Sequence, residues 1–267
     1  MKGFLPLCFA VLLAGGTVLL ADEPAVGLVD NLFLEAGAGA ERQPGDESAG
    51  FTQLGANWGI PLTPPEGVAL GLQLGGGLRL GEDNPEWNTT VGGFGRNLPS
   101  FPHQQGAAAM LVDYQRTPAH QDLWALRPIV GTTITPKDAL GLTGVVSLNH
   151  PPQAETIDSL TTFWTRGWSD RWGTEFGAGY EFKNTDKALF RARAAMGLTR
   201  SCDLWCGGDA NNFGSFAVGL GVTYHFGATG RHAVLDNIGG SGAGLFTPFP
   251  SAEFPAIMRR LTGPAQK

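Results

Sequence analysis

The sequence predicts an all-β protein, and three observations point to this class. Glycine accounts for 40 of the 267 residues, charged residues make up only 16%, and several long stretches alternate between apolar and small or polar residues. Each glycine inside a helix costs about 1 kcal/mol relative to alanine, so this composition disfavours helices. The glycines follow no three-residue period, which excludes collagen, and the aromatic content of 10% argues against disorder. We therefore expect one domain rich in strands and turns.

The N-terminal segment has the order of a secretory signal peptide. Residues 1–21 carry a single positive charge, Lys2, followed by an apolar run that ends near Ala21, and the acidic pair Asp22 and Glu23 follows. The alternative is a membrane-anchoring helix, but the run is at the short edge of the roughly 20 residues that a span requires. We expect cleavage near Ala21 and export of the mature chain, with no transmembrane helix after it.

The clearest strand lies at residues 68–80. Its even positions carry mainly Leu and Val, and its odd positions carry Gly, Ala, Gln and Arg, which is the two-residue period of a strand. Its 13 residues exceed the 9 to 11 that a tilted strand needs to cross a bilayer. The same alternation recurs clearly at residues 51–62, 175–182, 190–199 and 215–226, and more weakly at residues 31–40, 87–96, 107–116, 123–135, 139–149 and 157–166.

The face opposite the apolar residues indicates which environment these strands occupy. A strand surface in water is usually rich in Lys, Glu, Thr and Ser, whereas a membrane barrel turns its apolar face to lipid and its other face to a lumen. The opposite faces here carry mainly Gly and Ala. Most of the seven tryptophans lie near strand ends, as girdles at the two membrane interfaces require, although Trp58 lies well inside its strand. The alternative is a secreted soluble β-sandwich or barrel that binds a small apolar ligand.

The few charges on the small-residue faces predict a lumen crossed by ion pairs. They comprise four acids and four bases, with no lysine among them, and arginine suits fixed pairing with carboxylates in a confined space. Glycine and alanine would make room for these long side chains. The alternative is that they are ordinary surface charges. The predicted lumen residues are Glu35, Arg79, Asp113, Arg127, Glu175, Glu181, Arg191 and Arg193.

Residues 219–226 resemble the closing strand of bacterial outer-membrane β-barrel proteins. In that family the last strand carries a glycine and alternating aromatic or apolar residues and ends on an aromatic, usually Phe, and Gly221, Tyr224 and Phe226 match this pattern. The resemblance is to the small-barrel class, without a characterised subfamily. It implies a location in the bacterial outer membrane, contact with outer-membrane lipid, and recognition of this strand by the barrel-insertion machinery. The chain departs from the family in that 41 residues follow Phe226.

These observations together predict a single antiparallel up-and-down transmembrane β-barrel of about 12 strands. Eleven stretches alternate, and bacterial barrels have an even number of strands. A further strand within residues 202–212 would give twelve, and one false weak strand would give ten. The expected organisation is a signal peptide at 1–21, a barrel at 31–227 and a tail at 228–267 that plugs the lumen, lies in the periplasm or is disordered. The tail contains a Phe/Pro-rich stretch at residues 246–255.

Two cysteines remain after the signal peptide, Cys202 and Cys206. In an exported protein a pair at this spacing is a candidate disulfide within one loop. Two free thiols are the alternative, and a metal site is disfavoured because no histidine or second cysteine pair accompanies them at ligand spacing.

The sequence lacks the motifs of the common catalytic sites. No histidine is followed two residues later by serine, and no G-x-S-x-G, G-x-G-x-x-G or H-E-x-x-H motif occurs. His225 lies on the inner face of the closing strand beside no evident carboxylate, which favours a structural role. The net charge of −6 and the absence of a basic patch argue against nucleic acid. We expect no cofactor and a non-enzymatic barrel with a structural or narrow-channel role, whose outer-loop partner the sequence leaves open.

Overall fold

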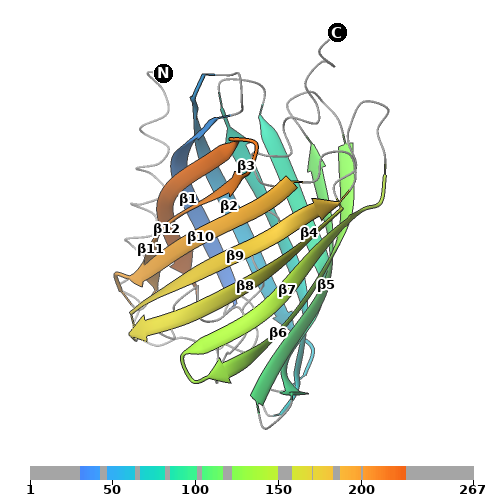
Figure 1. Cartoon of the computed structure of the whole chain (residues 1–267). Coiled ribbons are helices and arrows are strands. Elements are labelled where there is room, and N and C mark those ends of the chain that lie inside the picture. Colours follow the sequence, from blue (N-terminus) through green and yellow to red (C-terminus); the bar gives the residue numbers. More distant parts are fainter. Residues whose placement is uncertain are drawn as a thin grey trace.

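The chain forms a closed barrel of twelve antiparallel strands (Figure 1). The computed structural model describes residues 31–42, 47–63, 67–81, 85–100, 104–116, 122–149, 158–169, 171–182, 187–199 and 201–226. The strands are β1 (Leu32–Arg42), β2 (Ala49–Pro61), β3 (Ala69–Leu80), β4 (Glu86–Ser100), β5 (Gln104–Arg116), β6 (Asp122–Thr135), β7 (Asp138–Ser147), β8 (Asp158–Ser169), β9 (Trp172–Phe182), β10 (Lys187–Gly197), β11 (Cys202–Asn211) and β12 (Phe216–His225).

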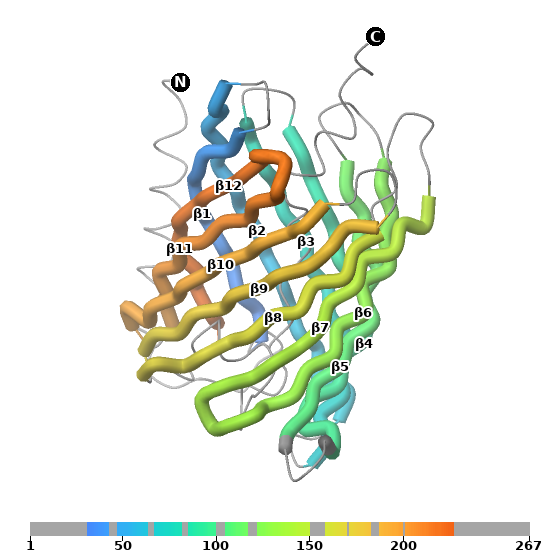
Figure 2. Tube along the Cα trace, in the orientation of Figure 1, coloured from blue at the N-terminus to red at the C-terminus, as the bar shows by residue number. Residues whose placement is uncertain are grey.

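Each strand pairs with its neighbours in the sequence, and β1 pairs with β12 to close the barrel (Figure 2). The strands are strongly tilted, and the start of β1 and the end of β12 lie at the same rim, because Phe33 pairs with His225. We call this rim the terminal rim and the opposite one the far rim. No helix in the described ranges is long and apolar enough to cross a membrane.

The prediction of twelve strands is confirmed, and the alternative of ten is wrong. All eleven predicted strands form, and the twelfth, β11, lies within residues 202–212, where a further strand was one of the two alternatives. The alternation does not reveal β11, because a large apolar residue faces the interior and a small one faces outward. Trp205 faces inward, whereas Cys206 is exposed on the outside. The predicted signal peptide at residues 1–21 and the tail at 228–267 lie outside the described residues.

The outer surface is apolar over its whole circumference. On β3, Leu70, Leu72 and Leu74 are exposed, and on β12 Leu220 is 61% exposed, whereas Ala69 and Gln73, on the other face of β3, are fully buried. The strands are 10 to 15 residues long, which is enough to cross a bilayer. The soluble alternative is not supported, because it requires these leucines and valines in the interior.

Aromatic side chains gather at both rims, as predicted. At the far rim, Tyr114 lies between Trp87 and Trp124, with ring centroids 4.8 Å apart in both pairs. At the terminal rim Trp168 stacks on Trp172 at 5.8 Å. Trp205 departs from the prediction, because it faces the interior and is buried.

Inward-facing aromatic rings lie over glycines of the neighbouring strand. A methyl group at Gly71 would lie 2.5 Å from Cζ of Phe94, its direct cross-strand partner. A residue with a side chain would overlap the ring at this position, whereas glycine allows the ring to lie against the barrel wall. The high glycine content therefore accommodates aromatic rings, in addition to the arginines that the sequence suggested. The four directly paired examples are Gly39 with Phe51, Gly71 with Phe94, Gly141 with Phe163, and Gly221 with Trp205.

Replacing one of these glycines should destabilise the barrel. We expect Gly71→Val to lower the free energy of unfolding by about 1 to 3 kcal/mol, because the added methyl groups overlap the ring of Phe94. The measurement is denaturant unfolding of the refolded protein in lipid vesicles.

The matched control is Gly93→Val on β4. A methyl group at Gly93 would meet nothing closer than 3.9 Å, so this variant should unfold close to the wild type. Equal destabilisation of the two variants would contradict the proposed role of the close approach.

Candidate functional site in the barrel lumen

The inner face of the barrel carries most of the charged side chains. All eight predicted lumen residues lie at strand positions opposite to the lipid-facing series, and Asp113 is 1% exposed. Two pairs form within this set, Arg127 with Asp113 and Arg193 with Glu35. Arg79, Glu181 and Arg191 pair with residues that the sequence analysis did not identify.

Glu35 on β1 is the centre of the largest polar group. Its Oε1 accepts a hydrogen bond from Gln53 Nε2 at 3.0 Å. Its Oε2 accepts one from Arg193 Nη2 at 3.1 Å and lies 3.5 Å from the donor Oγ1 of Thr223. The guanidinium of Arg193 also lies 5.0 Å from the ring centre of Trp205. Glu35 therefore joins side chains from four strands: β1, β2, β10 and β12.

The pair between Arg193 and Glu35 spans two strands of the inner face. Arg193 is on β10 and Glu35 is on β1, and the closed strand order places β11 and β12 between them. The two side chains meet at 3.1 Å over the inner face of these strands. Glu175, another predicted lumen residue, is the direct cross-strand neighbour of Arg193 on β9. The pair therefore lies beside the seam between β1 and β12.

A second group lies against the wall on the neighbouring strands β4, β5 and β6. Arg127 donates from Nε to Asp113 Oδ2 at 2.7 Å and from Nη2 to Oδ1 at 3.1 Å, which is a bidentate pair. Thr90 Oγ1 donates to the same Oδ1 at 2.6 Å. Because its members lie on adjacent strands, this group holds its side chains close to the wall.

Three partners of the predicted residues were missed. Arg79 pairs with Glu41 at 2.6 Å and stacks on Phe51, Arg191 pairs with Asp209 at 2.7 Å, and Lys187 lies 3.9 Å from Glu181. Lys187 also corrects the expectation that no lysine lies among the lumen charges. Glu41 and Lys187 lie just beyond the predicted strand ends, and Asp209 lies in β11. Extending the two-residue period past those ends would have identified Glu41 and Lys187.

His225 has a carboxylate partner, contrary to the sequence-based expectation. Its Nε2 lies 2.9 Å from Asp203 Oδ2, and both side chains are buried. The ring of Phe33 lies 5.9 Å away. Asp203 was missed because it belongs to β11. In the described part of the chain no group of three or more His, Cys, Asp or Glu residues is arranged to hold a metal ion.

The disulfide prediction is wrong. Cys202 and Cys206 are both free, and both belong to β11. Four residues of strand span about 13 Å, since each residue rises about 3.3 Å. A disulfide requires Cα atoms within roughly 7 Å, so the strand keeps the two thiols apart. The spacing suggested a loop, and the backbone is extended instead.

The residues of the closing-strand signal have structural roles in β12 and at its end. Tyr224 and Phe226 make an edge-to-face contact with centroids 4.9 Å apart. The backbone N–H of Phe226 donates to the carbonyl of Leu32 at 2.9 Å, which extends the pairing of β12 with β1. Gly221 leaves the space that Trp205 occupies.

Comparison with known proteins agrees with this geometry. A family model described as a porin subfamily matches residues 102–228. The matched segment is just under half of the chain, and together with the closed twelve-stranded barrel it makes this chain similar to outer-membrane β-barrel proteins of the small-barrel class. Among solved structures, the KdgM porin is 7% identical with a TM-score of 0.51, covering 73% of this chain and 99% of the porin. The NanC porin is 8% identical with a TM-score of 0.52, covering 72% of this chain and 100% of the porin.

A third similar structure is an enzyme. An active-site mutant of outer membrane phospholipase A from Escherichia coli is 10% identical with a TM-score of 0.50, covering 79% of this chain and 97% of the phospholipase. A search of curated proteins finds no match. At these identities the structural likeness shows the fold alone.

The extended conformation of β11 predicts that both thiols are free in the exported protein. Alkylation of the protein after unfolding, without any reductant, should modify Cys202 and Cys206 on the same peptide, as mass spectrometry would show. As a control, the same sample treated first with a reductant should give the same alkylated mass. A peptide that is alkylated only after reduction would contradict this description of β11.

Proposed function

We propose that this protein is a non-enzymatic outer-membrane channel whose lumen is narrowed by paired charges. The observation that carries the proposal is the ion pair between Arg193 and Glu35, which reaches from β10 to β1 over the inner face of β11 and β12. A closed barrel of this size with a polar inner face is the architecture of a channel. The porin subfamily model that matches residues 102–228 supports the same conclusion.

The charge balance of the lumen favours weak ion selectivity. Selective pores depend on rings of charge of one sign. Five bases on the inner face lie beside acids: Arg79 with Glu41, Arg127 with Asp113, Lys187 with Glu181, Arg191 with Asp209, and Arg193 with Glu35. Each pair has no net charge, so we propose that size rather than charge limits which small polar solutes pass.

The orientation of His225 argues against a lipid hydrolase. An enzyme acting on membrane lipid needs its nucleophile and base where the lipid can reach them. His225 is the only histidine in the described part of the chain, and its imidazole is buried inside the barrel beside Asp203. The likeness to the phospholipase is therefore a likeness of fold, and we propose a barrel without catalytic activity.

The proposal includes the route by which the chain reaches the membrane. Residues 1–21 would direct export and be removed, and the barrel-insertion machinery would recognise the strand that carries Gly221, Tyr224 and Phe226. The apolar outer face would then contact outer-membrane lipid. Outer-membrane barrels have short turns on the periplasmic side and longer loops on the outside. By analogy, the terminal rim would face the periplasm.

Removal of the bridging arginine should change conduction. We expect Arg193→Ala to raise single-channel conductance by about 1.5- to 2-fold and to shift the channel towards cations, because Glu35 loses its charge partner inside the pore. The measurement is the current through refolded protein in a planar lipid bilayer, with a salt gradient to determine selectivity.

The matched control is Arg166→Ala. Arg166 also pairs with an acid, Asp138 at 3.3 Å, and stacks on Trp168, but its strand position faces outward. This variant should conduct as the wild type does. A wild-type protein that inserts and passes no current would refute the channel, and an unchanged conductance in Arg193→Ala would refute the constriction.

A further inference from the structure

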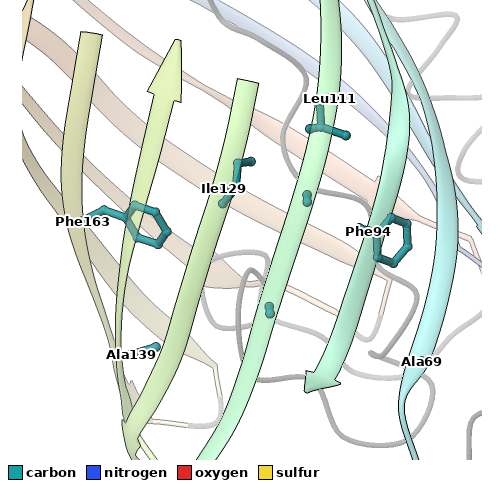
Figure 3. Packing of buried hydrophobic residues seen from close by; sticks show 8 residues of the cluster. Ala69, Phe94, Leu111, Ile129, Ala139 and Phe163 are labelled. Carbon is teal, nitrogen blue, oxygen red and sulfur yellow. The ribbon is translucent and has the colours of Figure 1, made fainter. Parts of the chain in front are cut away.

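Part of the inner wall is apolar, although the wall of an aqueous channel is expected to be polar. Inward-facing apolar residues on β3 to β8 form a contiguous cluster, which we call the inner apolar patch (Figure 3). Its members are cross-strand neighbours: Phe94 pairs with Ala109, and Ala109 pairs with Ile129. The patch consists of Ala69, Phe94, Ala107, Ala109, Leu111, Ile129, Ala139 and Phe163.

The inner apolar patch is buried. Ala69 and Leu111 are 0% exposed, and the charged residue between Ala69 and Ala107 in the strand register, Arg96, is also 0% exposed. On β10 the side chain of Arg191 is 36% exposed. The inner wall around Arg191 is therefore more open to water than the patch, whose residues are at most 9% exposed.

Side chains of the wall cover only part of the patch. The guanidinium carbon of Arg96 lies 5.8 Å from the ring centre of Phe94. The four alanines of the patch carry a single methyl group each. Small residues of this kind allow a backbone to approach closely. The side of the patch that faces the barrel axis therefore has room for a further segment.

We propose that the C-terminal tail occupies the lumen and packs its Phe/Pro-rich stretch, residues 246–255, on the inner apolar patch. The tail starts after Phe226 at the terminal rim. The patch lies towards the same rim, since Ala69 is the first residue of β3 and Ala139 is the second of β7. The 41 residues after Phe226 could extend over more than about 100 Å, so length imposes no restriction.

The composition of this stretch matches the surface it would cover. It contains Phe246, Phe249 and Phe254, which supply large apolar area, and Pro248, Pro250 and Pro255, which favour an extended polyproline conformation with little entropy to lose. Ten residues in that conformation span about 31 Å at about 3.1 Å each. The six strands of the patch span about 24 Å at about 4.8 Å per interval. One pass of the stretch is therefore long enough to cover the patch.

The position of the tail can be tested by photocrosslinking in the full-length protein. The photoreactive analogue benzoyl-phenylalanine replaces Phe249, the protein is inserted into lipid vesicles, and mass spectrometry locates the crosslinks after irradiation. We expect crosslinks within the same chain to peptides of β3 to β8 that include patch residues. The control places the same analogue at Phe190, which lies on the outer face and is 53% exposed, and should crosslink to lipid.

Crosslinks from position 249 only to lipid, to the outer face or to a second chain would overturn the proposal, as would no crosslink at all. A second measurement uses Ala109→Trp, which places a large ring on the patch and should reduce the crosslinks from position 249 at least severalfold. The control Val130→Trp, whose side chain is exposed on the outer face, should leave them unchanged. Neither measurement requires a current, so a silent bilayer would refute the channel proposal without affecting this one.

Discussion

The structure depends on the pairing of the first strand with the last. Within a bilayer no water is available for backbone N–H and C=O groups, so a sheet can cross only if it has no free edge. The pairing of β1 with β12 meets this requirement and runs from Phe33 opposite His225 to Arg42 opposite Phe216. Every other feature of the barrel, including the separation of a lipid face from a lumen face, follows from closure.

The seam is built from small residues and is held by side chains from other strands. Gly37 pairs with Gly221, and Gly39 pairs with Gly219, so the seam itself contributes little side-chain packing. Trp205 lies over Gly37 and Gly221 on the inner face, and Phe51 lies over Gly39. Glu35 adds hydrogen bonds from β2 and β10. Glu35 and Arg193, the pair that we propose narrows the lumen, therefore belong to the same group of residues that reinforces the seam.

The inner surface divides into two regions with different chemistry. The middle of β10 is polar and partly open to water, whereas the inner apolar patch is buried, although β5 and β6 also carry the charged pair of Arg127 and Asp113. In the channel that we propose, the open cross-section would lie beside Arg191 and Arg193. A tail packed on the apolar side would leave this path lined by paired charges.

The sequence by itself determined the two-residue period, its phase and the class of fold. Those features are local: alternation decides which side chains of β3 face lipid, and the mainly small or polar opposite face indicates a lumen. The same phase correctly placed all eight predicted charges on the inner face. Where the local pattern was reversed, as in β11, the sequence concealed a strand and with it Asp203, Asp209 and the extended spacing of the two cysteines.

Only the tertiary structure decided which charges meet. Arg193 and Glu35 are 158 residues apart, and Thr223 and Glu35 are 188 apart. Their proximity arises from the closure of the barrel and from the register of each strand pair, which hydrogen bonding between strands sets. The pairing of each aromatic ring with a glycine has the same origin. If the register of one strand shifted by one residue, the ring and the glycine would lie on opposite faces of the sheet. Alternation along a strand is a property of the strand, whereas contact across the lumen is a property of the closed sheet.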